Sequence, residues 1–225
     1  MTDRPILFSG PMVRALLAGT KTQTRRVLSA PKWSTGLADM ELCDDGIDAI
    51  ARISGCFAKV NLGFAVGDRL YVREAWRSHA AYDDISPAAM GGDEAILYVA
   101  DDAHQTWGYP AITKLGRFRQ GMHMPRWASR LTLAVSEVRV QRLQDIGEED
   151  AIAEGCAPLG SEFLIPGQYL YSDPSTPRTA ISATSAYESL WNQINEARGY
   201  GWDANPWIVA VSFTVEHRNI DEARP

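Results

Sequence analysis

The chain has 225 residues, of which 45% are hydrophobic and 22% charged, a balance typical of folded globular proteins rather than disordered or collagen-like ones. Its net charge of −6 disfavours extended, nonspecific binding to duplex nucleic acid, which relies on a basic face. Its three cysteines form no Cys-x-x-Cys pair, and no apolar run is long enough to cross a bilayer. The first residues lack a signal-peptide pattern. We therefore expect a cytoplasmic protein without a membrane span.

The N-terminal part of the chain predicts a strand, a helix and a second strand, in that order. The apolar run 6–8 indicates the first strand, and the helix begins near Pro11 and ends at Gly19. Alternating residues over 22–28 predict the second strand. The stretch 29–63 has weak periodicity, and we expect an insertion or a long loop there.

The middle of the chain predicts strands separated by irregular stretches. A Gly-Asp turn at 67–68 introduces a strand at 69–76. The longest strand-like segment, 130–143, shifts the phase of its apolar residues, which indicates a bulge or a break between two strands. A further strand at 95–100 is expected between a loop at 80–93 and an irregular stretch at 101–124.

The C-terminal part predicts two helices and a final strand. The segment 147–154 has helical composition and ends at Gly155, whereas 156–179 carries four prolines and indicates a surface loop. The strongest helical periodicity covers 183–198, and 207–215 is typical of a well-buried strand.

These elements predict an α+β fold. Strands outnumber helices and do not alternate with them regularly, which disfavours a doubly wound parallel sheet. We expect a small, mostly antiparallel β-barrel with peripheral helices. The composition shows no sharp break, so we expect a single domain over 1–225, with insertions at 29–63, 80–124 and 156–181.

The segment from Gly19 to Arg26 contains several side chains that could take part in catalysis, because a lysine, a hydroxyl and an arginine follow a glycine turn. Residues three apart on a strand face opposite ways. Lys21 and Thr24 can therefore share a site only if Lys21 precedes the strand, with Thr24 and Arg26 on one strand face. The alternative is a strand-forming threonine between two solvated charges.

Other familiar sites find little support in the sequence. The histidines lack the spacing of a metal site, and there is no glycine-rich phosphate loop and no Gly-x-Ser-x-Gly motif. We therefore expect no metal or cofactor, and either metal-free chemistry or a binding role.

The pattern Gly19-x-Lys21-x-x-Thr24-x-Arg26 resembles the hallmark of the ASCH domain, a branch of the PUA-like barrels. The usual hallmark has glutamate where this chain has Thr24. The threonine form is similar to that of the small bacterial N4-acetylcytidine amidohydrolases. Three later elements also resemble the family: Gly67-Asp68-x-Leu70-x-Val72, Ala151-Ile152-Ala153-Glu154 and the strand 207–215.

This chain is much longer than those small enzymes, so the resemblance covers the barrel elements and not the insertions. Among longer relatives it looks most like ASCH proteins of bacteriophages and prophages, particularly over 122–130. A phage or prophage origin would place the protein in the cytoplasm of a bacterial host.

The resemblance implies a hydrolase that acts on the exocyclic amide of an N4-acylated cytidine-type nucleoside or nucleotide, with Lys21, Thr24 and Glu154 as its catalytic residues. Thr24 would be the nucleophile, Lys21 its base, and Glu154 the proton donor to the leaving base. A nearby carboxylate raises a lysine pKa, so stabilising the oxyanion is an alternative role for Lys21. Arg26 would bind substrate or orient Glu154. Taken alone, Glu154 is also typical of a solvated helix end.

Tryptophans beside charged residues add candidates for substrate binding, since such pairs can stack a base and hold phosphate. Tryptophans at strand ends are also commonly core residues. We predict that Trp191 and Trp207 lie in the core. The candidates are Arg73, Glu74, Trp76, Arg126 and Trp127.

Three other functions remain open at this point. One is a non-enzymatic module that binds single-stranded RNA or DNA, for which Arg126 and Arg130 would matter. Another is an ASCH protein of the ribonuclease type, and the third is a phage assembly or host-interaction factor. The sequence leaves the oligomeric state open.

Overall fold

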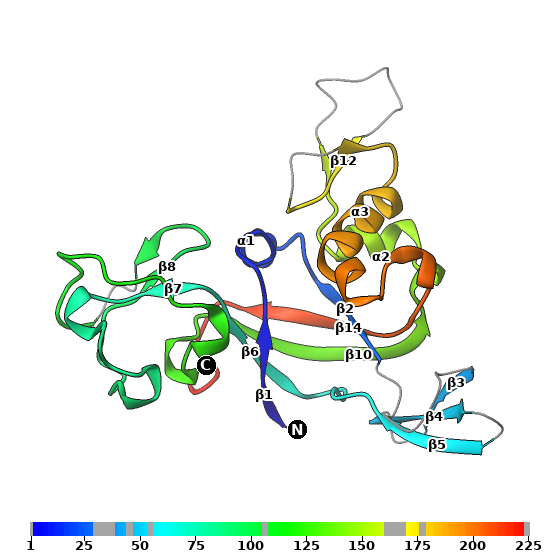
Figure 1. The fold of residues 1–225 in the computed structure, drawn as a ribbon, viewed down its shortest axis with the longest axis horizontal. Helices are drawn as coiled ribbons and strands as arrows, with labels where there is room; N and C mark the ends of the chain where they lie inside the picture. Colours follow the sequence, from blue (N-terminus) through cyan, green and yellow to red (C-terminus); the bar gives the residue numbers. More distant parts are fainter. Residues whose placement is uncertain are drawn as a thin grey trace. The chain divides into compact units, whose positions relative to one another are not determined.

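The computed structural model describes residues 2–28, 39–43, 47–53, 56–104, 108–159, 170–175 and 179–222 (Figure 1). The chain divides into two compact units. Unit 1 consists of Met1, Gly19–Asp68 and Val135–Thr214, and unit 2 of Thr2–Ala18, Arg69–Ala134 and Val215–Pro225.

Unit 2 contains the first predicted strand and helix. Strand β1 (Asp3–Leu7) pairs in parallel with β6 (Arg69–Arg73), and β6 pairs antiparallel with the start of β10 (Thr132–Arg142). Helix α1 (Gly10–Leu17) has Pro11 in its first turn. Gly19 follows the end of this helix with a φ of +70°, which favours glycine. The helix is confirmed, and the first strand is present but covers Asp3–Leu7 rather than the predicted 6–8.

A second, smaller sheet in unit 2 contains β7 (Trp76–Arg77), β8 (Leu97–Tyr98) and β9 (Ala103–His104). The strand expected at 95–100 is therefore shorter than predicted, and the stretch expected to be irregular contributes β9. Side chains of this sheet and of the following turns form a hydrophobic core that includes Trp76, Met90, Ile96, Tyr98, Met124 and Ala128. Two short 3-10 turns, Ala80–Tyr82 and Pro87–Ala89, lie between β7 and β8. Two more, Gly121–His123 and Arg126–Ala128, lie between β9 and β10.

Unit 1 places β2 (Gln23–Val27) antiparallel to β14 (Trp207–Glu216), and β14 lies next to β10. Strands β10 and β14 contribute residues to both units. Strand β10 is continuous, and two consecutive exposed residues, Ser136 and Glu137, separate its buried valines. The phase shift predicted from the sequence therefore occurs inside one strand.

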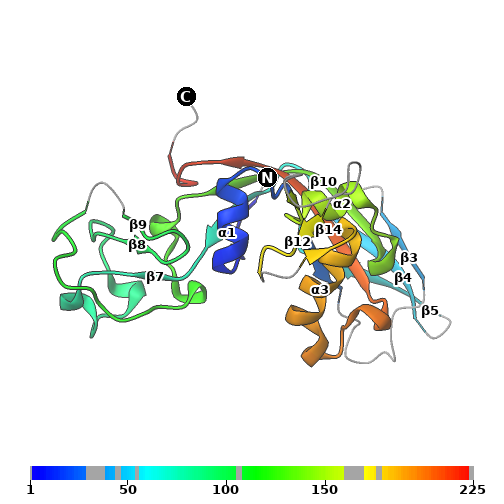
Figure 2. The same cartoon turned by 90° about the horizontal axis from the view of Figure 1, so that it is seen from above.

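Two helices of unit 1 pack against each other and against the sheet. Helix α2 (Glu148–Ala153) contacts β2 and α3 (Ala183–Asn195), and the two helices lie side by side in both views (Figure 1, Figure 2). Gly155 follows α2 with a φ of +102°, as the sequence predicts for a helix end. The described residues of this unit also form 3-10 turns at Leu143–Asp145, Glu196–Arg198 and Trp202–Ala204.

Two stretches that were expected to lack regular structure contain strands where the structure describes them. The surface loop predicted at 156–179 and the long loop considered for 29–63 were therefore wrong, whereas an insertion at 29–63 stays a prediction. The stretch 29–63 holds a sheet of β3 (Asp39–Leu42), β4 (Asp48–Ile53) and β5 (Cys56–Asn61). The stretch 156–179 holds β11 (Pro158–Leu159), β12 (Leu170–Ser172) and β13 (Thr179–Ala180). In β4 the buried face consists of alanines, whose small side chains hide the alternation in the sequence.

The protein is thus an α+β protein with mostly antiparallel strands and few helices, as the sequence predicts at that level. In the part of the chain that the structure describes, the pairings do not close a barrel. None of the helices in these described ranges is long and apolar enough to cross a membrane.

Candidate functional site

The candidate site in unit 1 forms where the chain enters β2 and passes the end of α2. Lys21 precedes β2 and makes an antiparallel bridge with Glu154, the residue that caps the C-terminus of α2. Next to it, the amide of Thr22 donates a hydrogen bond of 2.8 Å to the carbonyl of Ala153. These backbone contacts bring together two side chains that are far apart in the sequence.

Lys21 and Glu154 form a buried ion pair. The Nζ atom of Lys21 lies 2.6 Å from Oε2 of Glu154 and 2.8 Å from its carbonyl oxygen. Only 1% of Lys21 and 3% of Glu154 is exposed to solvent. Removing two charges from water is costly, and short hydrogen bonds such as these offset that cost only in part. The structure therefore brings together two of the three predicted catalytic residues.

Arg25 is the residue of this site that the sequence analysis missed. Its Nη1 lies 3.2 Å from Oε1 of Glu154, and its Nη2 lies 2.8 Å from Oδ2 of Asp150 on α2. The guanidinium also lies 5.7 Å from the centre of the Tyr187 ring on α3. Glu154 thus has one cation on each carboxylate oxygen, and Arg25 orients it, a role considered above for Arg26.

Thr24 lies on β2 and is linked to the pair through Arg26. The Nη1 atom of Arg26 donates a hydrogen bond of 2.7 Å to Oγ1 of Thr24. The same guanidinium interacts electrostatically with Lys21 and with Glu154. The predicted placement of Lys21 before the strand is confirmed, as is the shared face of Thr24 and Arg26. Both Thr24 and the ion pair are almost fully buried.

Burial changes the ionisation of several groups in this site. It lowers the pKa of Lys21, and this effect outweighs the opposite influence of Glu154. Burial also raises the pKa of the Cys156 thiol to about 12, so this neighbouring cysteine stays protonated near neutral pH. A lysine with a lowered pKa has the direction of shift that a general base needs.

The lowered pKa of Lys21 predicts a pH-dependent contribution to stability. Between the folded-state pKa and the ordinary value of 10.5, the unfolded chain binds more protons than the folded one. The free energy of unfolding, measured by urea denaturation at a series of pH values, should therefore rise with pH relative to a Lys21→Met variant. The slope can reach at most about 1.4 kcal/mol per pH unit. A difference that falls with increasing pH would contradict the lowered pKa.

Two further sequence candidates lie in unit 2 and are buried there. Glu74 accepts hydrogen bonds of 2.8 and 3.0 Å from Arg130 and is held as the counterion of that guanidinium. Trp76 is 0% exposed, and Arg119 lies 5.2 Å from the centre of its ring. The structure therefore places Trp76 in the core, without an exposed face on which a base could stack.

The remaining candidates in unit 2 are closer to solvent. Arg126 donates hydrogen bonds of 2.6 Å to both Asp3 and Asp221, which bind its polar edges. Arg73 packs over the ring of Tyr71 at 5.3 Å. Trp127 is half-buried and lines a pocket described below.

The two tryptophans assigned to the core differ in burial. Trp191 is buried, and its Nε1 donates a hydrogen bond of 2.7 Å to the carbonyl of Tyr200. Trp207 is only partly buried, and Arg142 lies 4.5 Å from the centre of its ring. The prediction for Trp207 was therefore too strong, because part of this residue is exposed and an arginine lies over its ring.

Over the described residues, no group of three or more His, Cys, Asp or Glu side chains is arranged to hold a metal ion. Comparisons with protein families, with curated proteins and with solved structures found no match. The function proposed below therefore rests on the sequence resemblance together with the geometry of the site.

Proposed function

We propose that Lys21, Thr24 and Glu154 form the active site of a hydrolase that cleaves the exocyclic amide of an N4-acylated cytidine-type nucleoside or nucleotide. The observation that carries the proposal is the contact of 2.6 Å between Lys21 Nζ and Glu154 Oε2, across 133 residues of sequence and almost out of reach of solvent. Buried ion pairs contribute little net stability, whereas perturbed titratable groups cluster at functional sites. A motif threonine on the adjoining strand adds the nucleophile.

We propose for the fold the ASCH branch of the PUA-like barrels. The order of the matching elements along the chain supports this assignment. The lysine–threonine motif follows α1 and enters β2, the Gly67-Asp68 turn introduces β6, and the Ala-x-x-Glu segment forms the end of α2. Strand β14 follows as the final strand and pairs with β2.

The proposed reaction begins when the proton of the Lys21–Glu154 ion pair lies on the carboxyl group, so that Lys21 is neutral. The hydroxyl oxygen of Thr24 attacks the acyl carbon while Lys21 Nζ takes the hydroxyl proton. As the bond from carbon to the exocyclic nitrogen breaks, Glu154 gives its proton to the ring nitrogen, and the base leaves as a neutral tautomer. The acyl group stays on Thr24 as an ester, and the lysine and glutamate are now an ion pair.

A water molecule then completes the cycle. The carboxylate of Glu154 takes a proton from this water, whose oxygen attacks the ester carbon. The ammonium of Lys21 returns a proton to the departing oxygen of Thr24. The products are the free carboxylic acid, the Thr24 hydroxyl and the neutral pair with which the cycle began.

The burial of the pair makes this proton exchange plausible on energetic grounds. The neutral and ionised forms of the pair hold the same protons and differ only in the place of one proton along a hydrogen bond of 2.6 Å. Burial disfavours the ionised form, whereas Arg25 on the second oxygen of Glu154 favours the carboxylate. The hydrogen bond from Arg26 to Thr24 also stabilises negative charge that develops on the threonine oxygen.

We expect the purified protein to convert N4-acetylcytidine into cytidine and acetate, which chromatography of the reaction mixture would detect. Thr24→Ala should lower kcat/KM by roughly 10³-fold or more, because the variant has no nucleophile. Thr24→Ser keeps the hydroxyl and should retain measurable turnover. Thr22→Ala is the matched control, because Thr22 is an exposed threonine two residues away.

Mass spectrometry of Thr24→Ser during turnover should detect the acylated serine. An inactive wild-type protein, or full activity in Thr24→Ala, would refute the proposed triad.

The alternative of nucleic-acid binding through Arg126 and Arg130 finds less support. Both guanidinium groups donate hydrogen bonds to carboxylates of the same unit, which are Asp3, Asp221, Glu74 and Asp101. Phosphate contacts would have to displace these bonds. No observation favours an assembly or host-interaction role.

A further inference from the structure

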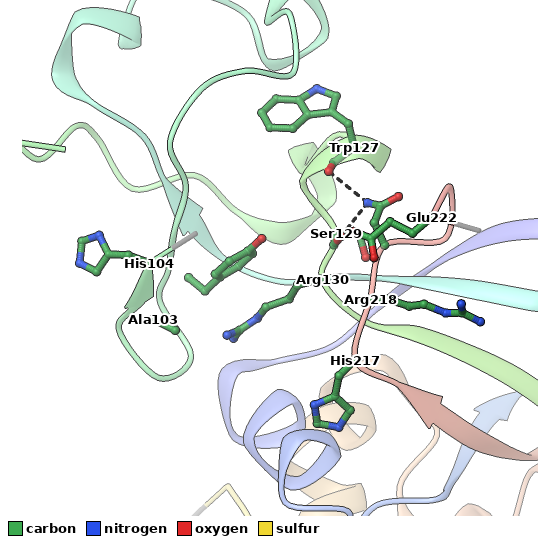
Figure 3. A pocket seen from close by; sticks show the side chains of 10 residues that line it. Ala103, His104, Trp127, Ser129, Arg130, His217, Arg218 and Glu222 are labelled. Atoms are coloured by element: carbon green, nitrogen blue, oxygen red, sulfur yellow. Dashed lines mark hydrogen bonds between the residues drawn. The ribbon is translucent and has the colours of Figure 1, made fainter. Parts of the chain in front are cut away.

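A pocket lies entirely within unit 2. It has a volume of about 260 Å³ and opens beside the start of β10 (Figure 3). Figure 3 shows Arg130 reaching across it, with Ala103 and His104 of β9 along one side and His217 and Arg218 along the other. The lining residues on which the argument depends are Tyr98, Ala103, Arg130, His217, Asn219 and Glu222.

The edges of the Arg130 guanidinium are occupied. Its Nε and Nη2 donate hydrogen bonds of 2.8 and 3.0 Å to Glu74, and its Nη1 and Nη2 donate bonds of 3.0 and 2.9 Å to Asp101. Two carboxylates therefore clamp the guanidinium in one plane and neutralise its charge. A phosphate or carboxylate ligand would find almost no free donor on this group.

One face of the same guanidinium is covered. The Arg130 guanidinium carbon lies 4.0 Å from the centre of the Tyr98 ring, and the Tyr98 hydroxyl is fixed by a hydrogen bond of 3.0 Å to the carbonyl of Ala128. Yet 17% of the Arg130 side chain remains exposed, and Arg130 lines the pocket. Because its edges and one face are occupied, the opposite face is the part of the guanidinium that is left for a ligand to contact.

The wall beside this face is held in place by Asn219. Its Nδ2 donates hydrogen bonds to the carbonyls of Arg126, Trp127 and Ser129, at 2.9, 3.0 and 2.7 Å. The C-terminal segment is thereby tied to the turn that precedes β10. The pocket is therefore preformed by hydrogen bonds and does not need a ligand to assemble it.

We propose that this pocket binds one small planar heteroaromatic ring of the nucleobase class, stacked on the open face of Arg130. Guanidinium planes stack well on aromatic rings, and a clamped guanidinium offers its face rather than its edges. A cavity of about 260 Å³ suits one nucleoside-sized molecule rather than a polymer. Side chains at the rim, such as His217 and Glu222, supply donors and acceptors for the edge of the ring. This proposal stands independently of the proposed hydrolase.

The test is isothermal titration calorimetry of the full chain with adenosine and cytidine, with ribose and inorganic phosphate as control probes. We expect both nucleosides to bind and both control probes to fail. Ala103→Phe, which fills the pocket from β9, should weaken nucleoside binding by about tenfold or more, whereas the matched Ala103→Ser should change it by less than about threefold. Arg130→Lys keeps the positive charge but removes the planar guanidinium group. We expect it to weaken nucleoside binding about as much as Ala103→Phe does.

Thermal unfolding of each variant shows whether it folds. Should Arg130→Lys unfold because Glu74 loses its clamp, Ala103→Phe decides the question by itself. The proposal is overturned if neither nucleoside binds, if binding survives in Ala103→Phe, or if phosphate or ribose binds as tightly as the nucleosides.

Discussion

Lys21→Arg is expected to lower kcat/KM for N4-acetylcytidine by about 10²–10⁴-fold, the range typical for loss of a general base. Arginine keeps a positive charge near Glu154 but does not deprotonate, so it cannot accept the proton of the Thr24 hydroxyl. The substitution therefore separates the two roles open to Lys21. If Lys21 acts as a base, the arginine variant loses that function. If Lys21 instead stabilises the oxyanion, the arginine variant largely keeps its activity.

The pH profile gives a second test of the same role. In the proposed mechanism the Lys21–Glu154 pair is active while it holds one proton, so kcat/KM of the wild-type enzyme should fall as the pH rises through the pKa at which the pair loses that proton. Burial lowers the pKa of Lys21, so this fall should occur below the ordinary lysine value of 10.5. Lys21→Arg should lose this fall, because arginine does not deprotonate. Lys114→Met serves as the control for removal of a lysine, because Lys114 is exposed in unit 2. Full activity of Lys21→Arg would exclude the base and favour the oxyanion role.

The sequence predicted the parts of the site that depend on local pattern. The alternation on β2 placed Thr24 and Arg26 on one face and required Lys21 to precede the strand, and the structure has both features. The glycine after Glu154 marked the end of α2, where the φ of +102° needs glycine. The pairing of Lys21 with Glu154 came from the resemblance alone, because nothing in the local pattern links residues so far apart.

The parts that escaped prediction depend on packing between elements. Arg25 contacts Asp150 and Glu154 only because α2 packs on β2, and the sequence does not reveal that contact. Strand alternation placed Arg25 and Arg26 on opposite faces of β2. The sequence feature that could have indicated a role for Arg25 was therefore this pair of adjacent arginines. The burial of Trp76 also depends on packing between elements. From the sequence, a tryptophan at a strand end is equally typical of the core and of a surface on which a base stacks.

The buried Lys21–Glu154 pair also predicts how a substitution at this site changes the free energy of unfolding. Glu154→Leu should lower the free energy of unfolding by about 3–5 kcal/mol near neutral pH, since it leaves Lys21 buried without its carboxylate. Arg25 retains Asp150 at 2.8 Å, so Lys21 carries most of the loss. Glu149→Leu is the matched control, because Glu149 is an exposed glutamate of α2, and its effect should stay within about 0.5 kcal/mol.

The double variant Lys21→Met/Glu154→Leu separates the cost of an unpaired charge from the value of the pair. Replacing a whole buried ion pair by apolar side chains is often neutral or stabilising, so the double variant should be more stable than Glu154→Leu alone. Urea denaturation of the four proteins of this cycle measures both effects. The loss in Glu154→Leu should shrink as the pH rises, because Lys21 escapes the penalty by deprotonating. If the double variant is instead the least stable of the four proteins, the Lys21–Glu154 ion pair stabilises the fold. The argument that this pair contributes little net stability and is present for function would then be wrong.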